Sequence, residues 1–115
     1  MPTSTGFVTS LRKRLMVDDV SVPNGRRRQI AEDGLGEVLL AVKQRAWVLD
    51  AWTSHHFTVA LKAASEGRYD DARLSAVAAL TPIDERAAAG LPNGKVKSLA
   101  DLQAELAKIR RTALR

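Results

Sequence analysis

The two histidines of this sequence, His55 and His56, offer the most versatile chemistry, because imidazole binds metals and transfers protons near neutral pH. Adjacent residues of a helix point about 100° apart, whereas a zinc-binding histidine pair lies four positions apart on one helix face. Asp50 precedes His55 by five residues, and this spacing marks neither a metal site nor a general acid–base pair. The sequence therefore predicts no metal site and no catalytic residue.

Phosphate-binding loops are not predicted either. The sequence contains no G-x-x-x-x-G-K-[ST] motif, and the segment from Gly34 to Gly36 has neither the preceding strand nor the third glycine of a dinucleotide fingerprint. We therefore expect no cofactor and no enzyme activity.

Basic residues form the clearest chemical pattern of the chain, which has a formal net charge of +5 and a sequence pI of about 10.1. They gather near the two ends, while the middle of the chain is acidic on balance. The clusters are Arg12, Lys13 and Arg14; Arg26, Arg27 and Arg28; and Lys108, Arg110, Arg111 and Arg115. Such clusters can bind phosphate, an acidic protein or the acidic middle of a second copy of the chain. The alternative is an ordinary solvated face.

The arginines at positions 26–28 follow Asn24, which is a candidate cap for a new helix. Cations at a helix start oppose the helix dipole and repel one another. This arrangement favours an external anion or acidic surface as their partner.

Composition indicates the fold that must position these residues. The 115 residues are 45% hydrophobic but only 4% aromatic, and alanine and leucine dominate, which favours helices over a sheet. We expect a flexible tail at 1–8 and a single helical domain at 9–115. The chain has no cysteine, no signal-peptide pattern and no membrane-spanning run. These features predict a protein that lies in the cytoplasm or inside a larger particle and does not enter a membrane.

The first half of the chain contains two predicted helical regions. A short helix is expected at 10–17, and a second helix starts near Asn24 and bends or restarts at Gly34 and Gly36. A helical stripe follows at Leu35, Val38, Leu39, Val42, Ala46, Leu49 and Trp52. The sequence has no glycine or proline from Glu37 to Glu66, and a continuous helix over this range would be about 45 Å long, so we expect a kink or break near 50–54.

Trp47 lies off this stripe. A large aromatic side chain is more often packed than exposed, so cover by the N-terminal segment is the favoured interpretation. Presentation to a partner is the alternative.

A helical hairpin is predicted around Gly67, which can adopt the left-handed conformation that ends a helix, while Asp70 or its neighbour can cap the next helix. Small residues line both predicted helices at Ala60, Ala64, Ala72, Ala76 and Ala79. The spacings of Ala60, Gly67, Tyr69, Ala72, Ala76 and Ala79 resemble those of a single tetratricopeptide repeat over residues 54–82. The resemblance implies a helical hairpin of a kind associated with protein binding, here within another bundle because no second copy occurs 34 residues away.

The C-terminal region begins with a predicted short helix from Pro82 to Ala89 and a turn at 91–94. Ser98 and Asp101 then resemble a capping box. Apolar residues repeat at helical spacing after it, at Leu99, Leu102, Leu106, Ile109 and Ala113. Packing in the core of the same chain and pairing with another subunit are both compatible with this stripe.

Together these patterns predict an all-α bundle of about four to five helices, with a central helical hairpin and an amphipathic C-terminal helix. The favoured function is a non-catalytic protein–protein interaction or structural subunit of a larger assembly, for example a viral particle, with a protein partner or self-association. Binding of the nucleic-acid phosphate backbone by the basic clusters is the alternative. The candidate residues of a helical interface are Trp47, Tyr69, Leu102, Leu106 and Ile109.

Overall fold

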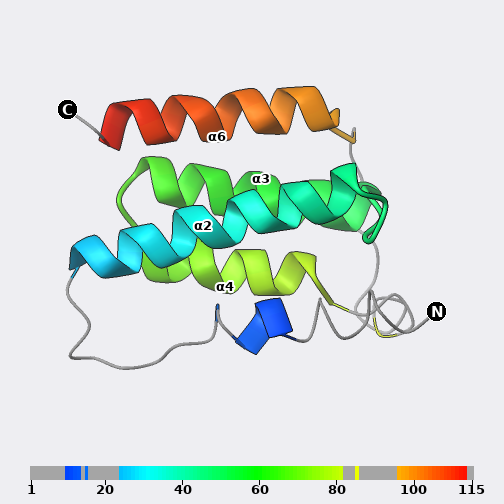
Figure 1. Cartoon of the computed structure of the whole chain (residues 1–115), viewed down its shortest axis with the longest axis horizontal. Helices are drawn as coiled ribbons and strands as arrows, with labels where there is room; N and C mark the ends of the chain where they lie inside the picture. Colours follow the sequence, from blue (N-terminus) through cyan, green and yellow to red (C-terminus); the bar gives the residue numbers. More distant parts are fainter. Residues whose placement is uncertain (1–9, 14, 16–23, 82–84, 86–95, 114–115) are drawn as a thin grey trace.

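The computed structural model describes residues 10–13, 15, 24–81, 85 and 96–113. Its regular elements within these ranges are helices, which confirms the prediction of an all-α bundle (Figure 1). They are α2 (Asn24–Lys43), α3 (Ala51–Ser65), α4 (Tyr69–Ala79) and α6 (Leu99–Ala113). The predicted tail at 1–8, the turn at 91–94 and most of the helix expected at 82–89 lie outside the described residues.

The four helices pack side by side, with α3 and α4 antiparallel and α2 antiparallel to α6 (Figure 1). Helix α6 lies at one edge of the bundle against α2 and α3. A short N-terminal helical segment, residues 10–13 and 15, lies at the opposite edge beside α4. The core between these elements consists largely of alanine and leucine, as the composition indicates.

The expected bend at Gly34 and Gly36 is wrong, because α2 is one helix of 20 residues that passes through both glycines. Each glycine instead makes room for a neighbouring element. A Cβ atom at Gly34 would lie 2.1 Å from Leu15 Cδ2, and Leu15 is 1% exposed. A Cβ atom at Gly36 would lie 3.2 Å from Nη2 of Arg110 on α6. The glycines therefore let the N-terminal segment and α6 approach α2 closely from two sides.

The chain does leave the helix between α2 and α3, but earlier than the predicted range of 50–54. Helix α2 ends at Lys43, and Arg45 adopts a left-handed conformation with φ 62°. Asp50 then caps α3, because its Oδ1 accepts a hydrogen bond of 3.0 Å from the backbone N–H of Thr53. The break is thus set by residues 44–50, and Asp50 begins the next helix.

Both tryptophans fix the end of α4 that lies near this break. Trp47 Nε1 donates to the Ala79 carbonyl and to Thr53 Oγ1, both at 3.2 Å, and Trp52 Nε1 donates to the Ala78 carbonyl at 2.8 Å. The Ala78 carbonyl also accepts from Thr81, so the tryptophan bonds add to those that pair the carbonyl groups at the C-terminal end of α4. Trp47 is half-buried against the core, so it is covered as expected, but the α3–α4 hairpin makes these contacts with it.

The central hairpin is present as predicted. Gly67 has φ 78° in the turn, and the alanines predicted to line the two helices are at most 4% exposed. The expected cap at Asp70 or its neighbour is wrong, because the N-cap of α4 is Arg68 and it makes no side-chain capping bond. Asp70 lies within the first turn of α4 and pairs with arginines instead.

The amphipathic C-terminal helix is also confirmed. Ser98 Oγ accepts a hydrogen bond of 3.1 Å from the N–H of Asp101, as expected at the start of α6. Leu102, Leu106 and Ile109 are 0%, 6% and 8% exposed within the core of the single chain. Their apolar side is therefore covered by the chain's own helices, as the core-packing alternative describes.

Candidate functional site

One end of the bundle concentrates charged side chains from three segments that are distant in sequence. The start of α2, the α3–α4 turn and the C-terminal end of α6 meet there, at the left of Figure 1. We call this surface the charged end, and its residues are Arg26, Arg27, Arg28, Glu32, Asp33, Glu66, Arg68, Asp70, Asp71, Lys108, Arg110 and Arg111. The fold thus brings together two of the three basic clusters of the sequence.

Cations of the charged end form ion pairs with carboxylates of the same chain. Arg27 Nη1 lies 3.1 Å from Asp70 Oδ2 and joins α2 to α4. Arg110 Nη2 lies 3.4 Å from Asp33 Oδ1 and donates to the Glu32 carbonyl at 3.0 Å, which joins α6 to α2. These side chains are about a third to two thirds exposed, and exposed ion pairs stabilise a fold by only about 0–1 kcal/mol. Their charges can therefore engage an external partner at small cost.

The other two arginines of the first helical turns of α2 bond within α2. Arg26 Nη1 donates to Gln29 Oε1 at 3.0 Å, and Arg28 Nε lies 3.6 Å from Glu32 Oε2. The Glu32 side chain is only 12% exposed, and its Oε2 accepts no hydrogen bond in the described part of the chain. The unfavourable position of the arginines near the start of the helix is thus offset partly by the Gln29 amide and the Glu32 carboxylate, which lie about one turn further along.

The α3–α4 turn contributes a third set of pairs. Arg68 donates hydrogen bonds to the carboxylates of Glu66 and Asp71. The bond from Arg68 lowers the pKa of Glu66 below its ordinary value, and the bonds to Glu66 and Asp71 raise the pKa of Arg68. The Glu66 carboxylate and the Arg68 guanidinium of this exposed pair therefore remain charged over a wider pH range than either group would alone.

Arg73 is a buried arginine that the sequence did not single out. It is 6% exposed, its Nη1 donates to the Leu15 carbonyl at 2.6 Å, and its Nη2 lies 3.3 Å from Asp70 Oδ1. Asp70 consequently bridges Arg73 and Arg27. The sequence signal for this ion pair was the spacing of three residues between Asp70 and Arg73, with Arg73 next to the buried Ala72. The role of Arg73 is to hold the N-terminal segment against the hairpin.

A cavity of about 470 Å³ lies within the charged end, between α2, the α3–α4 turn and α6. Tyr69 lines it and is half-buried, so this candidate interface residue lies at the charged end. The other lining residues are Glu32, Ala64, Ser65, Gly67, Glu105, Lys108 and Ile109. Two carboxylates and one ammonium group do not form an anion site, and the cavity lining contains neither a histidine nor a positioned nucleophile.

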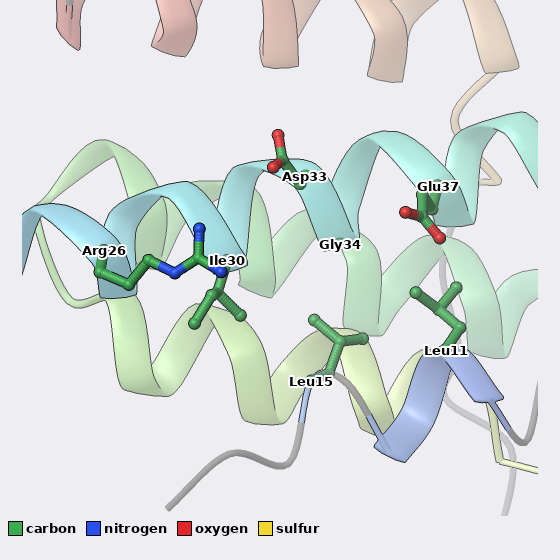
Figure 2. A pocket seen from close by; sticks show the side chains of 7 residues that line it. All are labelled: Leu11, Leu15, Arg26, Ile30, Asp33, Gly34 and Glu37. Atoms are coloured by element: carbon green, nitrogen blue, oxygen red, sulfur yellow. The ribbon is translucent and has the colours of Figure 1, made fainter. Parts of the chain in front are cut away.

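A second cavity, of about 300 Å³, is lined by the N-terminal segment and α2, beside the close contact of Leu15 with Gly34. Figure 2 shows Leu11 and Leu15 directed towards α2, the Arg26 guanidinium near Ile30, and Asp33 directed away from the leucines. Glu37 and Gly34 complete the lining. The floor is apolar and the charges lie along its rim, so this cavity offers packing space and no grouping for acid–base catalysis.

The first basic cluster is not part of the charged end. Lys13 is exposed and Arg12 is half-buried on the N-terminal segment, which lies beside the middle of α4 in Figure 1. Arg14 and Arg115 lie outside the described residues. Trp47 lies at the opposite end of the bundle.

The histidines pack against neighbouring rings. The centroids of His55 and His56 are 5.0 Å apart, and His56 lies 4.5 Å from Trp52. The residues that the structure describes contain no group of three or more histidines and acids placed to hold a metal ion. Within those same ranges, no helix has the length and apolar character needed to cross a bilayer.

Comparison with protein-family models, with curated proteins and with solved structures finds no match to this chain.

Proposed function

We propose that this protein is a non-catalytic helical subunit that binds another protein through its charged end. One observation supports this proposal most strongly: the exposed arginines of the charged end alternate with carboxylates from other helices, as in the Arg27–Asp70 and Arg110–Asp33 pairs. A surface of mixed sign fits a protein surface with complementary charges of both signs. A polyanion would instead be repelled by Asp33 and Asp70.

Binding of the nucleic-acid phosphate backbone is the second candidate. It is favoured by the convergence of the cluster at 26–28 with Arg110 and Arg111 at one end of the bundle, and by an excess of cations there. Such binding would be insensitive to base sequence and would weaken steeply with salt.

Replacing Arg26, Arg27 and Arg28 together with glutamine is expected to weaken partner binding while changing the free energy of unfolding by no more than about 1 kcal/mol, because the contacts of Arg26 and Arg27 are exposed and the Arg28–Glu32 pair, though its carboxylate is 12% exposed, is long at 3.6 Å. The binding defect should shrink at high salt, since exposed charges are screened beyond about 8–10 Å. Urea unfolding measures the stability. Affinity capture with mass spectrometry, followed by titration of the captured protein and of duplex DNA, measures the binding.

The matched control replaces Lys13, Arg45 and Lys97 with glutamine, since these exposed residues lie outside the charged end and the loss of charge is the same. An equal defect in both variants would mean that total charge matters and the charged end does not. If duplex DNA is the ligand, each lost phosphate contact should flatten the plot of log affinity against log salt by about 0.9. That result would replace the protein-binding proposal with the second candidate.

A further inference from the structure

A shallow groove of about 310 Å³ runs between α2 and α6, beside the charged end. Each helix lines it with residues at positions i, i+3, i+4 and i+7, and the helices are antiparallel (Figure 1). The lining residues are Gly36, Leu39, Leu40 and Lys43 from α2, and Gln103, Leu106, Ala107 and Arg110 from α6. Positions seven apart on a helix are about 10 Å apart, so the groove is about two helical turns long.

The middle of this α2–α6 groove is apolar. Leu39 and Leu106 form its floor and are 4% and 6% exposed. Leu40 is 44% exposed, and Ala107 is exposed beside it on α6. Because alanine is small, a third helix can approach α6 closely and cover Leu40.

Both ends of the groove carry a cation, and its lining contains no carboxylate. Lys43 is exposed at one end, and Arg110, with 45% of its side chain exposed, lies at the other. The bonds of Arg110 to Glu32 and Asp33 use Nη2, which fixes the position of the guanidinium at the edge of α2. The groove lining therefore presents two cations about two turns apart with an apolar centre, and one of them, Arg110, is also paired through Nη2 with Asp33, which does not line the groove.

We propose that the α2–α6 groove binds an acidic amphipathic helix of a partner protein. The helix would place carboxylates seven residues apart on Lys43 and Arg110, with apolar side chains at the third and fourth positions between them against Leu40 and Ala107. This is the helix-in-groove mode of recognition, in which an apolar stripe gives affinity and the flanking charges set orientation. The inference rests on the proposed protein-binding function and specifies the chemistry of the partner.

A second copy of this chain does not meet that requirement. No two acidic residues of the sequence lie seven positions apart, so none of its own helices can place carboxylates on both cations. The complementary helix must belong to a different protein.

The test uses two synthetic, fluorescein-labelled helical peptides and the full chain. One peptide repeats the pattern Glu-x-x-Leu-Leu-x-x-Glu, and the other has lysine in place of each glutamate. Fluorescence anisotropy at low salt should show the acidic peptide bound about tenfold or more tightly than the basic one, because the sign of both contacts is reversed. Lys43→Glu should reduce this preference, and Lys43→Glu combined with Arg110→Glu should reverse it.

Two neutral substitutions separate groove binding from general charge attraction. Leu40→Gln should weaken the binding of the acidic peptide several-fold. Leu74→Gln should leave that binding unchanged, because Leu74 is 53% exposed on α4 and lies outside the groove. Circular dichroism melts establish that each variant is folded, and Lys43→Glu alone keeps the test valid if Arg110→Glu unfolds the chain.

Failure of the acidic peptide to bind, equal binding of both peptides, or equal effects of Leu40→Gln and Leu74→Gln would overturn the inference. A dimer in light scattering that Leu40→Gln dissociates would also overturn it, because a second copy would then occupy the groove. If any of these contrary results occurs while the variant with glutamine at positions 26–28 still loses binding to its protein partner, the proposed function stands and only the groove inference is wrong. Peptide binding in the groove should survive the loss of those three arginines, because none of them lines the groove.

Discussion

Replacing Leu102 with alanine is expected to lower the free energy of unfolding by about 2–5 kcal/mol. Leu102 is fully buried in the core where α6 meets the bundle, so the substitution removes apolar contacts and leaves a cavity. Urea unfolding followed by circular dichroism measures the loss. The size of the effect depends on how far α2 and α3 can close the gap, because a rigid cavity is more destabilising than one that collapses.

The matched control is Leu74→Ala, since Leu74 is 53% exposed on α4 and should lose no more than about 0.5 kcal/mol. Equal, small effects of both substitutions would contradict the burial of Leu102. Loss of an oligomer with unchanged monomer stability would place Leu102 at an interface between subunits.

Replacing Gly34 with valine is expected to destabilise the fold by about 1–3 kcal/mol, the usual range for overpacking a filled site. The first added carbon would lie 2.1 Å from Leu15 Cδ2 and 3.1 Å from Leu15 Cγ. Leu15 is buried and its carbonyl accepts the bond from Arg73, so its backbone is held in place and its side chain can relieve the clash only by turning into the adjoining cavity. Thermal and urea unfolding both report this change.

Gly25→Val is the control, because a Cβ atom there would meet no atom within 4 Å. A double-mutant cycle gives the sharper test: Leu15→Ala should be clearly less destabilising in the Gly34→Val background than in the wild type, since it removes the clash. Additive effects of the two substitutions would show that Gly34 and Leu15 do not pack together.

The helices could be predicted because their signals are local. The alanine spacing and Gly67 define the hairpin, and Ser98 marks the start of α6, without reference to any distant residue. Gly34 and Gly36 were misinterpreted because a glycine inside a helix is destabilising by about 1 kcal/mol relative to alanine, which suggests a bend. The close approach of Leu15 and Arg110 accounts for both glycines, and neither partner is close in sequence.

The candidate site was predictable only in part for the same reason. The clusters at 26–28 and 110–111 are visible in the sequence as runs of charge. Their pairing with Asp70 and Asp33 depends on contacts across more than 40 residues, and no periodicity reveals it. The burial of Arg73 likewise depends on the carbonyl of Leu15, which lies 58 positions away.

The connection of α3 to α4 by a short turn has a consequence for the order in which the chain folds. Contacts between neighbours in sequence close with little loss of chain entropy, so we expect the α3–α4 hairpin to form early. Helix α6 is separated from α2 in the sequence by the whole α3–α4 hairpin, so we expect α6 to dock late. The α2–α6 groove exists only after α6 has docked. A partner helix in the groove would therefore bridge the last element to dock and the body of the bundle. It would slow unfolding while leaving the folding rate almost unchanged.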